Sequence, residues 1–191
     1  MAPESPADPR HVAFFRNMNL GQARSHSPTR PVLEAAFERA GAVRVRSFQT
    51  NGTVLFDPLG RSAARVIADV RDTLAEQVGY TEIAPSQPLP ELVSLVRQAQ
   101  AVVSADEHRA ITATFFEPLL ETVAGMDWAA VGTRIHPSGT TVVASGTGWV
   151  VTRYVMGGDP TVAVQAQLGA KATTRTLGTV QRLLRAAATH A

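Results

Sequence analysis

Four residues suited to binding an anion directly follow an apolar run near the start of the chain. Arg16, Asn17, Asn19 and Gly21 come at the end of the segment HVAFFRNMNLG, after residues 12–15. The apolar run predicts a strand that is buried on both faces. A guanidinium at the point where such a strand becomes a loop can hold a phosphate or carboxylate through two hydrogen bonds. We therefore expect a ligand site at the exit of this strand.

Two further segments carry residues of the same kind. Asn51 and Gly52 form a dipeptide that favours a tight hairpin turn. Thr173 and Thr174 precede the last predicted helix, and Arg175 stands beside them at its start. A threonine hydroxyl can cap that helix, and its free backbone amides beside a guanidinium favour a negatively charged ligand.

We hypothesise that the strand exit, the turn and the helix start converge on one anion-binding pocket. The alternative is purely structural. Thr173 would then be an ordinary N-cap, and Arg16 would bridge the two halves of the chain to a buried acid or carbonyl. The residue types leave both interpretations open.

Other polar residues give no pattern that predicts a reaction. The histidines show no i, i+4 pair, and residues 106–108 are more typical of an exposed loop or helix start than of a metal site. Glu117 and Glu121 lie one helical turn apart and fit a solvated face better than an acid–base pair. Residues 145–148 are glycine-rich but lack the lysine of a phosphate loop, and they predict a hairpin. We assign no metal, no cofactor and no catalytic residue.

The composition predicts a globular protein with uneven charge. The chain has 191 residues, 45% of them hydrophobic, and a net charge of +2. Residues 10–46 and the segment from residue 128 onward are basic, whereas residues 47–127 are acidic. The two basic segments either meet in one electropositive face or are solvated helix surfaces. With no cysteine, disulfides, thiol nucleophiles and cysteine-ligated metals are excluded.

Hydropathy predicts no contact with a membrane. The apolar runs are interrupted before the roughly 18 residues that a spanning helix needs. The first nine residues, MAPESPADP, lack the basic and hydrophobic parts of a signal peptide. We expect a cytoplasmic protein with a disordered tail over residues 1–10.

Periodicity predicts a first half over residues 11–86. Its elements are, in order, a strand, a helix, two strands, a helix and a short extended piece, over residues 11–17, 30–40, 43–49, 53–56, 60–78 and 80–84. Thr29 is the predicted N-cap of the first helix, and Gly79 closes the second. This order is the split β-α-β arrangement of a ferredoxin-like unit.

The rest of the chain predicts a connecting helix and linker over residues 87–107 and a second half over residues 108–191. The second half combines predicted strands at residues 109–116, 129–136, 140–144 and 148–156 with helices at residues 118–124, 160–168 and 175–188. The expected fold class is α+β. It consists of two ferredoxin-like halves packed together, the second rich in strands and ending in helices.

Three motifs resemble a known family. HVAFFRNMNLG, FQTNGTVLF (residues 48–56) and KATTRTLGTV (residues 171–180) are similar in order and spacing to motifs of the domain-of-unknown-function family 1697. Eight residues are of the same type as in the family's motifs: Arg16, Asn19, Gly21, Gly52, Ala172, Thr173, Arg175 and Thr179. Asn17, Thr53, Thr176, Leu177 and Gly178 depart from the family's pattern, with the loss of several hydrogen-bonding groups. The resemblance implies an α+β fold of two related halves and brings no established activity.

Two classes of function follow. The first, which we favour, is a non-catalytic module that binds a phosphorylated or otherwise anionic small ligand. A nucleic-acid version of this class would stack bases on Phe14, Phe15 and Phe56. The second is an enzyme acting on a small anionic substrate, with Arg16 and Arg175 as electrostatic stabilisers and no identifiable base. The sequence leaves the oligomeric state open.

Overall fold

The structure, a computed structural model, describes residues 10–22, 25–103, 110–117, 134–136, 139–155 and 157–189. Three predictions fall wholly or partly outside these residues. They are the tail, of which residues 1–9 are not described, the helix at residues 118–124 and the first part of the strand at residues 129–136. The chain divides into two compact units, Met1–Leu89 and Pro90–Ala191. In the described part of the chain, no helix has the length and apolar character needed to cross a bilayer.

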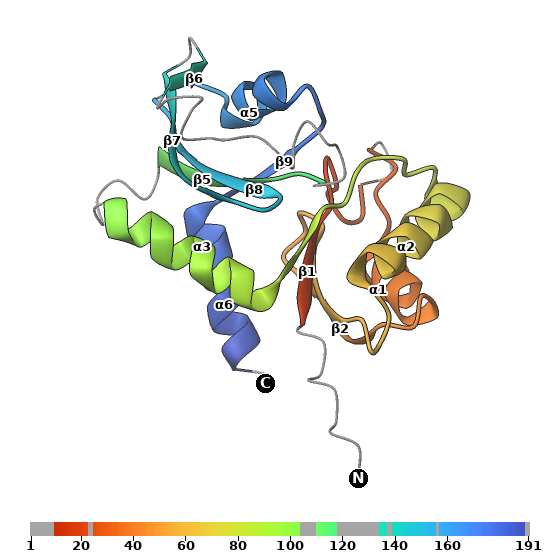
Figure 1. Ribbon diagram of the computed structural model, residues 1–191. Coiled ribbons are helices and arrows are strands. Elements are labelled where there is room, and N and C mark those ends of the chain that lie inside the picture. Colours follow the sequence, from red (N-terminus) through yellow and green to blue (C-terminus); the bar gives the residue numbers. More distant parts are fainter. Residues whose placement is uncertain are drawn as a thin grey trace. The chain divides into compact units, whose positions relative to one another are not determined.

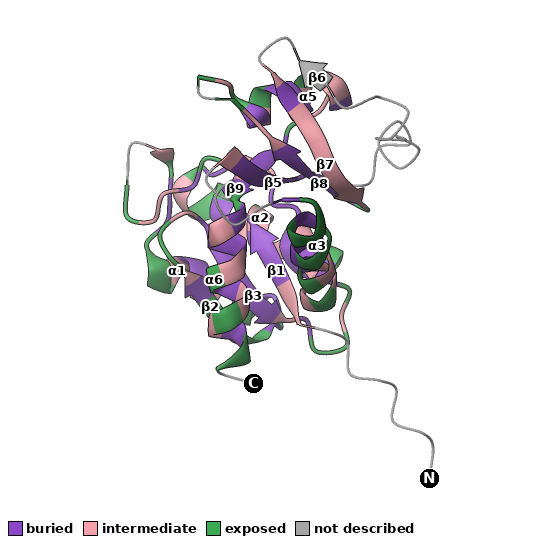
Figure 2. Ribbon diagram, turned by 90° about the vertical axis from the view of Figure 1, so that its left-hand side faces the viewer, coloured by how far each residue is buried: buried purple, intermediate pink, exposed green. Residues whose placement is uncertain are grey.

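The first unit has the predicted element order (Figure 1). The elements are β1 (His11–Phe14), α1 (Arg30–Arg39), β2 (Val43–Phe48), β3 (Thr53–Asp57), α2 (Ala63–Val78) and β4 (Ser86–Pro88). They form an antiparallel sheet with strand order β2-β3-β1-β4, which is the order of a ferredoxin-like unit. The central strand β1 is buried along almost its whole length (Figure 2).

Helices α1 and α2 cover one face of this sheet. Side chains that alternate along β1 and β3 point to that face because successive strand residues face opposite ways. Phe15, Val54 and Phe56 pack there against Phe37 of α1 and Leu74 of α2. The aromatic rings of Phe37 and Phe56 are 5.0 Å apart at their centroids. This cluster is the core of the first unit.

Two strand predictions in this unit are wrong by more than one residue. Strand β1 ends at Phe14 and not at Asn17, because the backbone turns into the left-handed region at Asn17, where φ is 54°. The last strand is not the predicted piece at residues 80–84 but β4, in a proline-rich stretch. Proline is tolerated there because β4 lies at the edge of the sheet, where its missing N–H leaves no ladder bond unmade.

The second unit repeats this plan. It contains α3 (Leu89–Val102, from Pro90 on), β5 (Ile111–Phe115), β6 (Arg134–His136), β7 (Thr140–Gly146), β8 (Trp149–Arg153), α5 (Pro160–Leu168), β9 (Thr173–Thr176) and α6 (Leu177–Ala188). The sheet order is β6-β7-β8-β5-β9. When β5, β7, β8 and β9 are matched to β1, β2, β3 and β4, the two strand orders are the same, and β6 is an added edge strand.

Details of the backbone confirm that the two sheets correspond. The N–H of Phe15 donates to the carbonyl of Gly52 at 2.8 Å, and the N–H of Phe116 donates to the carbonyl of Gly148 at 3.0 Å. In each unit a strand exit is thus tied to the glycine of the hairpin beside it. The last strand of each set also runs directly into a helix, β4 into α3 and β9 into α6. The α+β class with two related halves is confirmed.

Helices pack on both faces of the second sheet (Figure 1). Phe116 and Val150 point to one face, where they pack against Ala163 and Val164 of α5. Trp149 points to the other face, and its indole Nε1–H donates to Glu91 of α3 at 2.9 Å. Helix α6 contacts β5 and β9. Every large apolar side chain of β5 and β8 is buried.

Strand β2 is an edge of the first sheet, and side chains of α1 occupy part of that edge. The Arg30 guanidinium donates to the carbonyls of Ser47 (2.8 Å) and Gln49 (3.0 Å). One helical turn later, the Glu34 carboxylate accepts from the Ser47 N–H at 2.8 Å. These backbone groups would otherwise be free to pair with a strand of another chain. Arg30 and Glu34 form an edge clamp.

The hairpin between β2 and β3 depends on Gly52. Its φ is 66°, and a Cβ at this position would lie 2.7 Å from the Met18 Cβ and 2.8 Å from the Phe15 Cβ. Only glycine allows the turn to approach the exit of β1 this closely. By contrast, Gly60 has φ 75° with no heavy atom within 4 Å of the added Cβ.

The edge clamp gives the first prediction. We expect Glu34→Ala to lower the free energy of unfolding by about 1–2 kcal/mol, since it leaves the Ser47 N–H without its acceptor. We also expect concentration-dependent self-association through β2. Chemical denaturation and light scattering measure the two effects, with exposed Glu38 on the same helix mutated to Ala as the control. Equal behaviour of the two variants would show that the clamp does not protect the edge.

Gly52 gives the second prediction. Gly52→Ala and Gly60→Ala both force alanine into the left-handed region, at a cost of about 1–2 kcal/mol. Only the first adds an atom where Met18 and Phe15 already lie, so we expect it to destabilise by about 1–3 kcal/mol more. Denaturant unfolding of both variants gives this difference directly. A difference near zero would mean that the loop after β1 moves aside freely.

Candidate functional site

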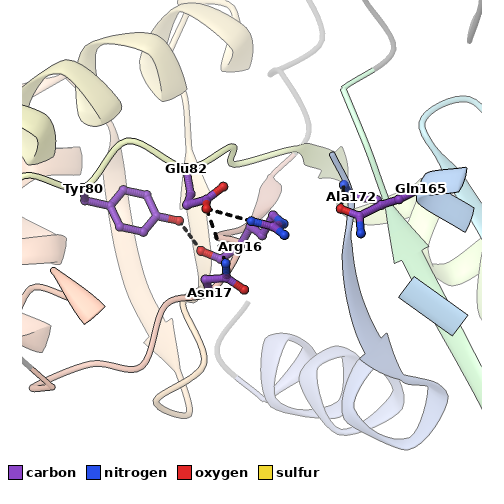
Figure 3. Close-up of polar contacts among 6 residues, drawn as sticks. All are labelled: Arg16, Asn17, Tyr80, Glu82, Gln165 and Ala172. Carbon is purple, nitrogen blue, oxygen red and sulfur yellow. Dashed lines mark hydrogen bonds and ion pairs between the residues drawn. The ribbon is translucent and has the colours of Figure 1, made fainter. Parts of the chain in front are cut away.

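Arg16 lies at the exit of β1, as the sequence predicts, and its partner is an acid of the same unit. The guanidinium Nη1 donates to Glu82 Oε1 at 2.7 Å (Figure 3). The two side chains are 23% and 25% exposed, so the pair is half-buried. The backbone is fixed as well, because the Arg16 N–H donates to the Ile83 carbonyl and the Tyr80 hydroxyl donates to the Arg16 carbonyl at 2.6 Å. Arg16 is thus held by three separate contacts.

This contact matches one part of the structural alternative and corrects another. Arg16 does bridge to an acid. However, Glu82 belongs to the segment that joins α2 to β4, so the bridge lies within the first unit and does not join the two halves. Among the described residues, Glu82 is the partner of the Arg16 side chain, and Nε and Nη2 make no further hydrogen bond to them.

Asn17 stands beside this pair. Its amide Nδ2 is 3.4 Å from Glu82 Oε1, a long hydrogen bond, and its side chain is exposed. The left-handed backbone at Asn17 turns the chain away from the sheet. Asparagine tolerates this conformation better than most residues, which suits it to this turn.

The loop after β1 and the hairpin turn lie side by side. The Leu20 N–H donates to the Thr50 carbonyl at 2.8 Å, and the Gly21 N–H donates to the Pro28 carbonyl at 3.0 Å. The Asn19 N–H donates to the Ser27 hydroxyl at 2.9 Å. The structure therefore brings together five predicted residues with Arg16, which are Asn17, Asn19, Gly21, Asn51 and Gly52. We call these six residues the strand-exit site.

Several members of the strand-exit site have local structural roles. The Asn51 Oδ1 accepts from the Thr53 hydroxyl at 2.9 Å, which stabilises the hairpin turn. Gly52 permits the close approach to Phe15. Gly21 has φ 83°, which favours glycine. Arg16 and Asn17 are therefore the residues whose side chains are best placed to meet a ligand.

The segment at residues 173–176 is a strand, which corrects the predicted helix start. Thr173, Thr174 and Arg175 belong to β9, paired antiparallel with β5 through Phe115↔Thr173 and Ala113↔Arg175. Helix α6 begins at Leu177, and its N-cap is Thr176, whose hydroxyl accepts from the Thr179 N–H at 3.2 Å. Threonine is β-branched and suits a strand, and β5 has an edge that β9 fills.

The three predicted residues of β9 point to opposite faces of the second sheet. Arg175 is buried, and its Nη1 donates to the Thr173 hydroxyl and the Thr174 carbonyl, both at 2.9 Å. The Thr174 hydroxyl lies on the α5 side, with the hydroxyls of Thr114 at 2.9 Å and Thr161 at 2.8 Å. Before β9, the Ala172 N–H donates to Gln165 Oε1 at 3.1 Å and fixes the turn (Figure 3).

The single pocket that the sequence predicts would need residues from both units. The strand-exit site belongs to the first unit, and Thr173, Thr174 and Arg175 belong to the second. Their convergence stays a prediction. The expected helix N-cap at Thr173 is wrong, so any anion at the start of α6 would meet the amides after Thr176.

The aromatic residues considered for base stacking are buried. Phe15 and Phe56 belong to the core beneath α1 and α2, and Phe14 is 1% exposed. They are therefore not available to stack bases on the sheet. Among the described residues, no three metal-ligating side chains form a group. Glu121 lies outside the described residues.

Sequence reasoning missed Tyr80 and Glu82. Both precede β4, and the mistaken strand at residues 80–84 placed them in the sheet. Because β4 neighbours β1 in a ferredoxin-like unit, the segment leading into β4 must pass the exit of β1. An acid in that segment was a signal for a partner of Arg16.

Comparisons with known proteins agree with this fold. The chain is similar to a conserved bacterial protein, SP0830 from Streptococcus pneumoniae, with 14% sequence identity and a TM-score of 0.64. The match covers 93% of this chain and 98% of that chain. At this identity the likeness establishes the fold alone. No curated protein matches the chain.

The sequence profile of one family covers most of the chain. It is described as a protein of unknown function (DUF1697), and it matches residues 9–137. This range contains the first two motifs of the sequence, whereas residues 171–180 lie beyond it. The matched part of the chain includes the whole strand-exit site. The chain belongs to the DUF1697 family of proteins of unknown function.

Proposed function

We propose that the protein is a non-catalytic module that binds a small anionic ligand, such as a phosphate ester, at the strand-exit site. The observation that carries this proposal is the state of Arg16. Glu82 holds one end of its guanidinium at 2.7 Å, while Nε and Nη2 make no hydrogen bond to any other described residue. A guanidinium held in place offers its free donors without losing much side-chain entropy on binding.

Glu82 sets the strength of such a site. Its negative charge opposes an incoming anion, but its oxygen also keeps the planar fork in one orientation. Since both side chains are about one quarter exposed, water screens part of this repulsion. The balance predicts a weak, exchangeable site and not a permanently occupied one.

The strand-exit site is better suited to binding than to catalysis. The two titratable side chains that touch Arg16, those of Tyr80 and Glu82, are both engaged in hydrogen bonds that hold the loop. A general acid or base needs a proton position facing the substrate. Here the Tyr80 proton is directed to the Arg16 carbonyl.

The third prediction tests Arg16. We expect Arg16→Ala to weaken binding of inorganic phosphate or phosphomonoesters at least about ten-fold, because a charge-assisted hydrogen bond is lost. Isothermal titration calorimetry at low salt measures the affinity. Arg39→Ala is the control, because this exposed arginine ends α1 at the opposite end of the unit.

A second variant separates binding from a structural role. Glu82→Gln removes the competing charge and should tighten phosphate binding, whereas a merely structural pair would only lose stability. The proposal fails if the wild type binds no member of the phosphate panel, or if Arg16→Ala binds equally well with an unchanged melting temperature. Turnover abolished by Arg16→Ala would instead support an enzyme.

A further inference from the structure

A second group of arginines lies at the other end of the first sheet. Strands β1 and β2 both begin at this end, and the antiparallel β3 ends there. Arg10 therefore stands just before β1, Arg44 and Arg46 lie in β2, and Asp57 closes β3. The strand-exit site is at the opposite end of β1.

A bulge in β2 controls where its arginines point. Val43 pairs with Asp57 and Arg46 pairs with Leu55, so Arg44 and Val45 together lie opposite Phe56. Val45 packs against the core under the helices. Without the bulge, Arg46 would lie opposite Val54, on the face that α1 and α2 cover. The bulge thus keeps Arg46 out of the core and on the same face as Leu55 and Asp57.

One carboxylate, that of Asp57, is bonded by Arg44 and lies within electrostatic range of Arg10. Asp57 Oδ2 accepts from Arg44 Nη2 at 2.6 Å, and Asp57 Oδ1 accepts from the Leu59 N–H at 3.1 Å. Both oxygens of the carboxylate are therefore engaged. The group formed by Arg10, Arg44, Arg46 and Asp57 carries an excess of two positive charges. We call it the basic cluster.

Arg10 has donors that the described part of the protein does not use. Its Nε and Nη1 atoms are buried and have no hydrogen-bond partner among the described residues. Its backbone is fixed, because its carbonyl accepts from the Leu89 N–H at 2.7 Å. Buried guanidinium donors without acceptors are costly, so an added acceptor at this point would stabilise the protein.

The electrostatics point the same way. Burial lowers the pKa of the Arg10 guanidinium, the charge of Arg44 lowers it further, Asp57 raises it, and Arg46 lowers it. For Asp57, burial raises the pKa of the carboxyl, but the hydrogen bonds from Arg44 and the Leu59 N–H and the charges of Arg44 and Arg10 together lower it below its usual range. The cluster therefore keeps one carboxylate and three mutually repelling cations, and an anion would relieve the repulsion.

We propose that the basic cluster is a second anion site that takes a dianion of the phosphate-monoester type. Two observations select this chemistry. The excess of two positive charges matches the charge of a phosphate monoester near neutral pH. The guanidinium groups of Arg10 and Arg46 supply forked donors that fit phosphate oxygens, while Arg44 is held by Asp57.

The experiment uses the full chain carrying Arg16→Ala, so that failure of the strand-exit site cannot affect the result. Inorganic phosphate and phenyl phosphate are titrated at low salt, with arginine Nε–H resonances and calorimetry as readouts. We expect saturable binding that shifts the Arg10 resonance. Arg46→Gln, at an exposed position, should weaken it at least about five-fold, and Arg10→Gln should do the same where that variant folds. Arg39→Gln is the matched control.

The direction in which the phosphate affinity changes in one further variant distinguishes a binding site from a purely structural cluster. Asp57→Asn keeps an acceptor for the Leu59 N–H but removes the competing charge, so phosphate binding should tighten about three-fold or more. The proposal is overturned if phosphate does not bind, or if Arg10→Gln and Arg46→Gln bind it as well as Arg39→Gln does. Preference for a polynucleotide with a steep salt dependence, uncompeted by phosphate, would also overturn it.

Discussion

The burial of β1 at the centre of its sheet is the constraint on which the rest of the first unit depends. A strand with neighbours on both sides must satisfy its backbone through two ladders, and here these are β3 and β4. The chain can leave such a strand only at its end, where Phe15 is already tied to Gly52 and Arg16 to Ile83. The polar residues after β1 are therefore held against two other segments.

Arginine has several distinct tasks in this unit. Arg30 holds the edge of β2, and Arg61 joins the end of α1 to α2 by contacting the Ala40 carbonyl and Asp69. The hydrogen bond from Arg61 lowers the pKa of the Asp69 carboxyl. The basic stretch at residues 10–46 is thus partly structural. What distinguishes Arg10 from Arg30 is that two of its donors are buried without an acceptor among the described residues.

Sequence patterns predicted the elements that depend on local periodicity. Helix α5 has the predicted bounds, and Gly79 ends α2 in the left-handed conformation as expected. The wrong predictions concern segments whose secondary structure depends on pairing with a distant strand. Residues 86–88 include Pro88, lie between Pro85 and Pro90 and have no apolar alternation, yet they form β4 because β1 needs a partner there. Residues 173–176 could cap a helix or extend, and pairing with β5 selected the strand.

The candidate site was predicted less completely than the fold, for the same reason. Arg16 and the Asn51–Gly52 turn were found because strand exits and turns have local signatures. Glu82 and the bulge of β2 were not, since an ion pair over 66 residues and a register shift leave no local pattern. The resemblance to the family located the motifs, but it could not show which of their residues contact one another.

Correspondence between the two units separates residues that hold the fold from those that do not. Phe15 and Gly52 in the first unit correspond to Phe116 and Gly148 in the second, with the same backbone hydrogen bond. One residue later, Arg16 corresponds to Glu117. The last strands correspond in the same way. Gln87 lies opposite Val12, and Arg175 lies opposite Ala113, the residue that corresponds to Val12, so Gln87 corresponds to Arg175. Because both sheets form with either charge at the strand exit, the sheet itself does not require a cation there. The guanidinium of Arg16 must then be explained by what the first unit alone does, either its pairing with Glu82 or the ligand binding that we propose.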